Sequence, residues 1–224
     1  AIMRGCNNFC TFCVVPYTRG REVSRELKNI LREARDLAMR GAKEIWLLGQ
    51  NVNSYTAKGF GFYELLEEMV TVEGLERIRF TSPHPNDWND ELSDLMVSNK
   101  KICNQLHLPF QAGSSRMLTE MRRGHTPEEY LGKLAYMRSV NPGLELSTDI
   151  IVGFPTETEE EFQDTLQVVR DARFSQIFPF KYSPRPKTKA AQMEDDVPRE
   201  EKEERLARLI ALQREIHEVD IQKL

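Results

Sequence analysis

The chain has 224 residues, of which 40% are hydrophobic and 29% charged, and its formal net charge is −4 at pH 7. These values are typical of one ordinary globular domain that is long enough to bury a core. No apolar run approaches the roughly 20 residues of a membrane span, so the composition excludes a membrane-spanning chain. The negative net charge also means that the chain is not basic overall, unlike many nucleic-acid-binding proteins.

Hydrophobic periodicity, caps and turns predict strands that alternate with helices along the chain. The predicted strands are short and largely apolar: 1–4, 44–48, 77–81, 105–109, 144–152 and 177–182. The predicted helices alternate with them: 27–38, 63–72, 90–99, 127–140, 158–171 and a last one that begins at Pro198. Six strands in alternation with helices predict a parallel sheet with right-handed crossovers.

Two of the predicted helices begin with a capping box. Thr126 stands three residues before Glu129, and Thr158 stands three residues before Glu161. The acidic stretches 157–161 and 194–204 are interpreted as solvated starts of helices, where negative charge is favourable. The last helix is predicted to be amphipathic, with four apolar residues facing inward: Leu206, Leu209, Ile210 and Ile216.

Three of the four cysteines follow the first predicted strand. Cys6, Cys10 and Cys13 have the spacing C-x3-C-x2-C. Three thiolates on one short loop suit an iron–sulfur cluster, and they leave one iron of a cubane without a protein ligand. Structural zinc prefers four ligands, usually in two pairs, whereas Cys103 stands alone far along the chain. The spacing therefore favours a cluster over zinc, and because thiolate ligands are lost to oxidation we expect a cytoplasmic protein.

The cysteine loop, with an aromatic residue before its last cysteine, resembles the motif of the radical S-adenosylmethionine enzymes. Five segments in order narrow this resemblance to the methylthiotransferase family: CTFCVVPYTRGREVSR, LLGQNVNSY, HLPFQAGSSRML, DIIVGFPTETEEEF and YSPRPKTKAA. The resemblance implies a partial (β/α)6 barrel of the TIM type, with parallel strands inside, helices outside and one open side. It also implies that residues 1–224 are the core domain. The family's N-terminal domain with a second cluster and its C-terminal RNA-binding domain are absent from the chain.

In barrels of parallel strands the functional site lies at the carboxyl ends of the strands, and the distinctive polar segments follow predicted strands here. By resemblance, Gln50 and Asn51 contact the methionine amino group of S-adenosylmethionine, although this segment also suits a plain turn. Gln111 and Ser114 are expected near the same cofactor. Ser114 is equally a candidate N-cap for a following helix, and the two roles are compatible.

The remaining cofactor contacts are predicted around the adenine and in the fifth strand. Asp149 stands inside an apolar strand, where a carboxylate is costly unless it is paired or faces the pocket. By resemblance, the segment with Ile151 and Gly153 flanks the adenine, and Phe12 offers its ring to the same base. Together with the three cysteines, these residues make up the predicted site.

The resemblance also implies an activity. A [4Fe–4S] cluster and S-adenosylmethionine would generate a 5′-deoxyadenosyl radical for methylthiolation at C2 of N6-isopentenyladenosine, next to the tRNA anticodon. The chemistry belongs to the cofactors, so no side chain is predicted to be catalytic. The implied partners are the tRNA anticodon stem-loop and an electron donor such as flavodoxin or ferredoxin, and we expect a monomer. Threonylcarbamoyladenosine in tRNA or a ribosomal protein side chain are alternative substrates, and a non-catalytic zinc- or RNA-binding module is the alternative from another class.

Basic residues cluster at three places in the sequence: after the cysteine loop, after the fourth predicted strand and after the sixth. The members of these groups are Arg19, Arg21 and Arg25, then Arg116, Arg122, Arg123 and His125, and finally Lys181, Arg185, Lys187 and Lys189. A basic rim on an acidic body is typical of a face that docks RNA, and scattered surface charge is the alternative interpretation.

Overall fold

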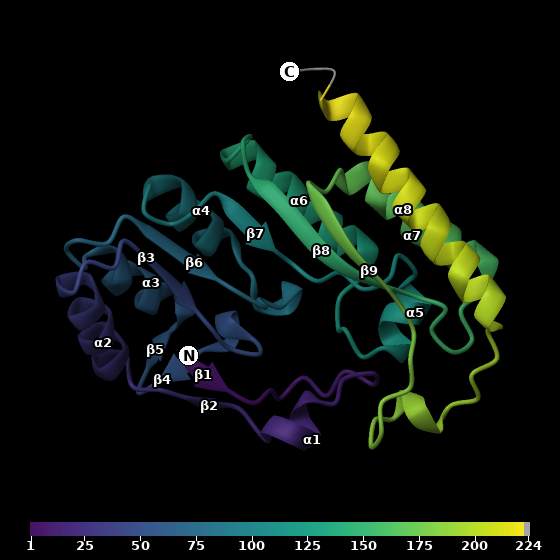
Figure 1. Ribbon diagram of the computed structural model, residues 1–224, viewed down its shortest axis with the longest axis horizontal. Coiled ribbons are helices and arrows are strands. Elements are labelled where there is room, and N and C mark those ends of the chain that lie inside the picture. Colours follow the sequence, from purple (N-terminus) through teal and green to yellow (C-terminus); the bar gives the residue numbers. More distant parts are fainter. Residues whose placement is uncertain (222–224) are drawn as a thin grey trace.

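The computed structural model describes residues 1–221 of the chain. Strands form a curved inner wall, and helices lie along its outer side (Figure 1). The strands of this wall are β1 (Met3–Arg4), β3 (Glu44–Leu47), β6 (Arg77–Phe80), β7 (Gln105–His107), β8 (Glu145–Val152) and β9 (Gln176–Lys181). The covering helices are α2 (Leu27–Met39), α3 (Phe62–Val70), α4 (Asp90–Ser98), α6 (Pro127–Val140), α7 (Glu159–Ala172) and α8 (Arg199–Ile221). The predicted alternation is confirmed, and its boundaries agree to within two residues.

The wall is parallel, but its hydrogen bonding is not continuous. β3 pairs with β6, and β7, β8 and β9 pair in that order, all in parallel. A single parallel bridge between Ile78 and Ile102 joins the two sheets. β7 begins three residues after Ile102 and does not itself pair with β6. At the other end, the N–H of Ile2 donates to the carbonyl of Leu48 at 2.8 Å and ties the first strand to β3. The result is an open, partial barrel.

The core lies between the wall and the helices. Along β8, alternate residues such as Leu146 and Ile150 are buried against the helices, while Ser147 and Asp149 between them face the inner side. In a closed barrel the inner side would be filled by packed side chains. Here Trp46 and Phe180 on the inner side are each about half exposed, at 52% and 53%. The inner face is therefore an accessible surface rather than a core.

Several small elements extend the predicted pattern. They are α1 (Val15–Arg19), α5 (Ser115–Glu120), β2 (Val23–Ser24), which pairs with β1 antiparallel, and the hairpin of β4 (Thr56–Ala57) and β5 (Phe60–Gly61). Three 3-10 turns also occur, at Val52–Ser54, Pro85–Asp87 and Ala190–Gln192. In the hairpin, Lys58 and Gly59 both have positive φ, which two-residue hairpin turns require. No helix of the described residues combines the length and apolarity needed to cross a membrane.

The caps predicted from the sequence are present. Thr126 Oγ1 accepts from the N–H of Glu129, whose carboxylate accepts from the N–H of Thr126 in return. Thr158 and Glu161 form the same reciprocal pair at the start of α7. The inward face of α8 differs from the prediction. Leu209 and Ile216 are buried and Leu206 and Ile210 are half-buried, but the same helix also buries Arg205.

Candidate functional site

The cysteine loop leaves β1 and coils back on itself through local backbone features. Gly5 has φ +76°, and a Cβ there would lie 2.2 Å from the carbonyl oxygen of Arg21, so only glycine fits. The N–H of Gly5 donates to Gln50 Oε1 at 2.7 Å, and the N–H of Cys6 donates to the carbonyl of Gly20. Phe9 also has a positive φ. These contacts curl the loop around a common centre.

The three thiols of this loop are reduced and lie within electrostatic reach of one another. Cys6 and Cys10 are buried and Cys13 is half-buried. Burial raises the pKa of the Cys6 thiol above its ordinary value, and the charges of Cys10 and Cys13 raise it further. Burial likewise raises the pKa of Cys13, with an added contribution from Cys10. Three thiolates that repel one another in a buried loop need a cationic centre to hold them deprotonated.

The nature of that centre follows from the spacing of the thiols. Within the described part of the chain, no three His, Cys, Asp or Glu side chains come close enough together to hold one metal ion. A single zinc ion draws its ligands into one tetrahedral shell. In a cubane each cysteine binds a different iron, and three protein ligands suffice. Three thiols on one loop therefore fit an iron–sulfur cluster better than structural zinc, which takes four protein ligands.

Four of the predicted cofactor contacts line one cavity beside the cysteine loop. Phe12, Gln111, Asp149 and Ile151 border a cavity of about 270 Å³, together with residues of β9 and the segment that follows it. Gln111 has φ +78° and forms a parallel bridge with Ile150, which carries the pairing of β8 beyond the end of β7. The cavity thus lies at the carboxyl ends of the strands, where the barrel architecture predicts it.

Asp149 is both paired and at the border of the cavity, as expected for a carboxylate inside an apolar strand. Its carboxylate faces this cavity, and Oδ2 lies 3.4 Å from His107 Nε2 on the neighbouring strand. His107 Nδ1 lies 3.0 Å from Ser147 Oγ, so the imidazole is held on both sides. The pair fixes the carboxylate at the border of the cavity.

Gln50 and Asn51 lie on the other side of the cysteine loop and do not line that cavity. Gln50 orients the start of the loop through Gly5. Asn51 is buried, its Nδ2 donates to Asp87 Oδ2 at 2.7 Å, and its Oδ1 has no partner. A buried acceptor without a donor is costly. The amino group of a bound ligand would supply the missing donor to Asn51 Oδ1. The contact of Asn51 with the methionine amino group stays a prediction.

Ser114 and Gly153 have structural partners outside the cavity. Ser114 caps α5 by accepting from the N–H of Met117, and its Oγ donates to Glu161 Oε1 at 3.0 Å. Gly153 has φ +67°, and a Cβ there would lie 2.3 Å from the Cγ of Lys202 on α8. Helix capping and close packing already require these two residue types. Their cofactor contacts stay predictions.

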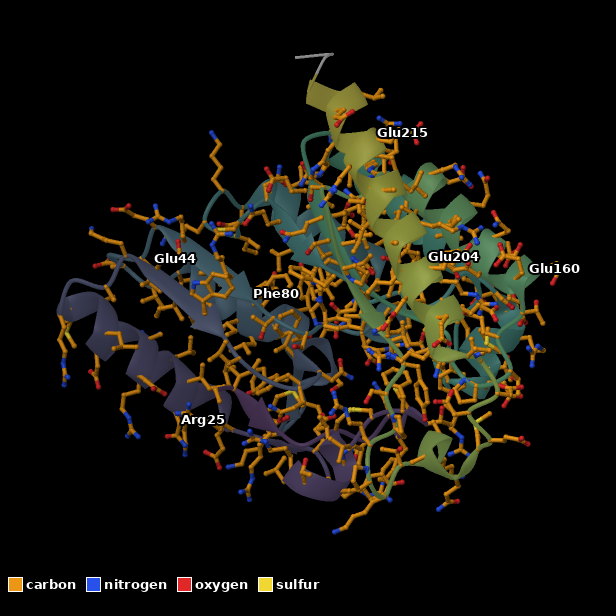
Figure 2. All side chains as sticks on the ribbon, turned by 45° about the vertical axis from the view of Figure 1, so that its right-hand side comes forward. Arg25, Glu44, Phe80, Glu160, Glu204 and Glu215 are labelled. Atoms are coloured by element: carbon orange, nitrogen blue, oxygen red, sulfur yellow. The ribbon has the colours of Figure 1, made fainter. Side chains whose placement is uncertain are left out.

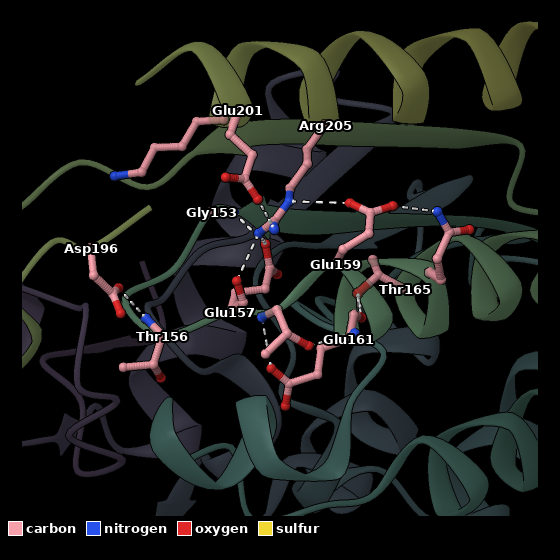
Figure 3. A network of polar contacts seen from close by, with 12 residues as sticks. Gly153, Thr156, Glu157, Glu159, Glu161, Thr165, Asp196, Glu201 and Arg205 are labelled. Atoms are coloured by element: carbon pink, nitrogen blue, oxygen red, sulfur yellow. Dashed lines mark hydrogen bonds and ion pairs between the residues drawn. The ribbon is translucent and has the colours of Figure 1, made fainter. Parts of the chain in front are cut away.

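The loop after β8 is clamped to α8 by a buried ion pair (Figure 3). Glu157 and Arg205 have side chains only 1% exposed, and Arg205 Nη1 lies 2.7 Å from Glu157 Oε2. The N–H of Gly153 donates to the same oxygen at 2.6 Å, and Glu201 pairs with Arg205 from within α8. Burial raises the pKa of Glu157 to about 7, although Gly153 and Arg205 oppose this. The clamp fixes the backbone that follows Ile151.

This clamp corrects the interpretation of 157–161 as a solvated helix start. Glu157 and Glu161 are buried, because each meets an arginine from elsewhere in the chain: Arg205 for Glu157 and Arg116 for Glu161. Solvated acidic residues do occur farther along the outer helices. Figure 2 shows Glu160 on α7 and Glu204 on α8 on that side of the molecule.

The basic rim is smaller than predicted. Arg123 and His125 are buried rather than exposed, and Arg116 pairs with Glu161 at 2.7 Å. Besides Arg116, the exposed residues of the predicted rim are Arg19, Arg21, Arg122, Lys181, Arg185, Lys187 and Lys189. Among these, Lys181 pairs with Glu203.

Arg123 is the site residue that the sequence did not reveal. It is 5% exposed, its Nη1 lies 3.4 Å from Cys10 Sγ, and its Nη2 donates to the carbonyl of Pro109 at 2.8 Å. Its neighbour Arg122 is exposed. The adjacent pair of arginines gives no indication of which one turns inward. The following Gly124, with φ +69°, and Arg122, with φ +56°, both mark an unusual backbone path around Arg123.

Comparison with known proteins identifies the family of the chain. Residues 1–169 match the model of the Radical SAM superfamily. A tRNA-2-methylthio-N(6)-dimethylallyladenosine synthase from Bdellovibrio bacteriovorus is 53% identical over 219 residues, which cover 97% of this chain and 48% of the relative. The synthase of the same name from Geotalea uraniireducens is 50% identical over 218 residues, covering 96% of this chain and 50% of the relative. The chain thus spans about half the length of these relatives.

Solved structures confirm the predicted fold class. The radical S-adenosylmethionine methyltransferase TsrM from Kitasatospora setae superposes with a TM-score of 0.70 at 20% identity, over 84% of this chain and 37% of that chain. Coproporphyrinogen III oxidase from Escherichia coli, a radical SAM enzyme, gives a TM-score of 0.65 at 18% identity, over 95% of this chain and 51% of that chain. At such identities the likeness concerns the fold alone.

Proposed function

Since the chain belongs to the radical SAM superfamily, we propose that it is the cofactor-cleaving core of a tRNA methylthiotransferase. The proposed reaction places a methylthio group on C2 of N6-isopentenyladenosine next to the anticodon. About 50% identity to synthases named for this product, along nearly the whole chain, supports the choice of substrate. The observation that carries the proposal is the cysteine loop beside the cavity of Phe12, Gln111, Asp149 and Ile151, at the carboxyl ends of the strands.

The cofactors of this superfamily are S-adenosylmethionine and a [4Fe–4S] cluster, which Cys6, Cys10 and Cys13 would hold here. When bound, they supply one-electron cleavage of the sulfonium to methionine and a 5′-deoxyadenosyl radical. The chain's own residues bind the cofactor, orient it and keep water from it.

Each lining residue has a chemistry that suits one part of the cofactor. Phe12 and Ile151 offer apolar contact to the adenine. Asp149, held by His107, offers a carboxylate acceptor to ribose hydroxyls. Outside the cavity lining, Asn51 Oδ1, which lacks a donor, would accept from the methionine ammonium group. Such contacts would fix where the reactive carbon points, and positioning of this kind is the main contribution of the protein.

The proposed partner is the anticodon stem-loop of tRNA. The exposed Arg19, Arg21, Arg185, Lys187 and Lys189 lie near the cysteine loop and after β9, where they can contact phosphates at the mouth of the site. In the full-length protein, we propose a further domain with the second cluster as the source of sulfur, and an RNA-binding domain. A flavodoxin or ferredoxin would supply electrons to a monomer in the cytoplasm, where thiols stay reduced.

The substrate assignment is tested with the full-length protein, reductant and S-adenosylmethionine. Anticodon stem-loops that carry adenosine, isopentenyladenosine or threonylcarbamoyladenosine are supplied in parallel, and the nucleosides are analysed by mass spectrometry after digestion. The proposal expects the methylthio product from the isopentenyladenosine RNA only. Product from the threonylcarbamoyladenosine RNA alone would replace the substrate, and no product with active cofactor cleavage would refute the tRNA assignment.

A further inference from the structure

We infer that Arg123 is a positioning residue that acts through Cys10 and raises the reduction potential of the cluster. The inference rests on the proposed function, because it requires a cluster on the three cysteines. The guanidinium contacts a cluster ligand rather than the exposed surface, with Nη1 3.4 Å from Cys10 Sγ. Reduction adds a negative charge to the cluster, so a fixed cation with an N–H directed at a ligand sulfur favours the reduced state.

The charge balance around Arg123 supports this assignment. Its side chain is almost fully buried, and no carboxylate of the described residues pairs with it. A buried cation without an anion is costly, so the site calls for a negative partner. Nη2 is satisfied by the carbonyl of Pro109, whereas Nε has no partner. Cys10 is the group within hydrogen-bonding distance that becomes anionic when it binds iron.

The arginine and the cysteine loop are held together as one unit. Thr11, the residue after Cys10, donates its N–H to the carbonyl of Met121 at 3.1 Å and its hydroxyl to the carbonyl of Glu120 at 2.7 Å. The N–H of Arg123 donates to the carbonyl of Leu118 at 2.8 Å. The distance between the guanidinium and Cys10 is therefore set by short backbone contacts at the end of α5.

The backbone on the other side of Arg123 is fixed as well. Asn86 Nδ2 donates to the carbonyl of Arg123 at 3.0 Å. Gly124 has a positive φ, and a Cβ there would lie 2.6 Å from Asn86 Nδ2. This close approach requires glycine at position 124, and the contact with Asn86 fixes the backbone from which the Arg123 side chain extends.

Two buried histidines face the same guanidinium and add no charge of their own. Burial and, to a smaller extent, the charge of Arg123 together lower the pKa of His84 to about 2 and that of His125 to about 4. Their rings lie 6.2 Å apart in an edge-to-face arrangement. Near neutral pH both are uncharged, so Arg123 supplies the local positive charge at Cys10.

The test is a redox titration of the reconstituted cluster followed by electron paramagnetic resonance, without S-adenosylmethionine. Arg123→Met removes the charge and the donors but keeps most of the volume, and Arg123→Lys keeps the charge but loses the planar fork of N–H donors. Arg122→Met is the matched control, because it removes the same charge from the exposed neighbour. Iron content is measured for every protein.

At a potential where half of the wild-type cluster is reduced, Arg123→Met is expected to lower the ratio of reduced to oxidised cluster about tenfold, which equals 59 mV for a one-electron couple. Arg123→Lys should fall between the two, and Arg122→Met should match the wild type. A wild-type ratio in Arg123→Met with full iron content overturns the inference. If Arg123→Met holds no iron, Arg123→Gln decides, because it removes the charge but keeps a polar side chain: a ratio lowered threefold or more supports the inference, and an unchanged ratio overturns it. A wild-type chain that assembles no iron–sulfur cluster would refute the proposed function instead.

Discussion

The buried carboxylate of Glu157 gives the fold a pH dependence that can be calculated from the structure. Burial raises its pKa to about 7 from an ordinary value of 4.5. Between these two pH values the unfolded chain releases the proton while the folded chain retains it. Stability is therefore fully present below pH 4.5 and is lost as the pH rises to about 7. At about 1.36 kcal/mol for each pKa unit, this group lowers the free energy of unfolding by about 3 kcal/mol across that interval.

The perturbation is Glu157→Gln, which cannot ionise. The glutamine carbonyl can replace Oε2 and accept from Gly153 and Arg205, while its amide takes the place of Oε1, which has no partner in the wild type. An unpaired buried amide costs about 1–3 kcal/mol, but this cost does not depend on pH. The change in the free energy of unfolding with pH thus reports the ionisation of Glu157, whereas a constant difference between wild type and variant does not.

The assay is urea denaturation followed by circular dichroism at pH 5, 6, 7 and 8, for the wild type and Glu157→Gln. The stability difference, wild type minus variant, should fall by about 2.5 kcal/mol between pH 5 and pH 8. Glu201→Gln is the control, because Glu201 meets Arg205 from the partly exposed side of the pair. Curves for the wild type and Glu157→Gln that stay parallel across this range would refute the raised pKa and the burial argument behind it.

Three further predictions, the first with a matched control, test the roles assigned to residues in and near the site. Gly153→Ala should destabilise the fold by more than the roughly 1–2 kcal/mol that a left-handed backbone costs a residue with a Cβ, because this Cβ would also clash with Lys202. Gly132→Ala, at an open helical position, is the control and should stabilise the fold by about 0.5–1 kcal/mol. Equal shifts of the melting temperature in the two variants would contradict this. Asp149→Ala should weaken S-adenosylmethionine binding about tenfold in calorimetry, because a charged hydrogen-bond acceptor at the cavity is lost; unchanged affinity would remove it from the site. Ser114→Ala should cost about 1 kcal/mol of stability with no loss of affinity, and a tenfold loss would give it a cofactor role.

Local patterns in the sequence were enough to predict most of the fold. The strand predicted at 144–152 and the capping box of Thr126 and Glu129 depend on neighbours within a few residues, and both were found where expected. The cysteine loop is equally local, because its three ligands lie on one turn of chain. The β4–β5 hairpin was missed because its strands are two residues each, too short for any periodicity.

The interactions that the sequence could not predict join distant segments. Glu157 pairs with Arg205, 48 positions away, and Arg123 reaches Cys10 across 113 positions. In both cases a charged residue was expected at the surface, as charged residues usually are. What buries it is a partner whose position depends on the whole fold. Helix capping explains the serine at position 114, and close packing explains the glycine at position 153. No local sequence pattern distinguishes these structural roles from a cofactor contact.

The most direct test of the central claim is iron and sulfide analysis after anaerobic reconstitution, combined with an assay for 5′-deoxyadenosine under dithionite. Wild type is compared with Cys10→Ala and with Cys103→Ala, whose cysteine lies outside the loop. The account predicts about four irons per chain and 5′-deoxyadenosine in the wild type and in Cys103→Ala, with both lost or strongly reduced in Cys10→Ala. Zinc in place of iron, or a filled cluster that yields no 5′-deoxyadenosine, would contradict it.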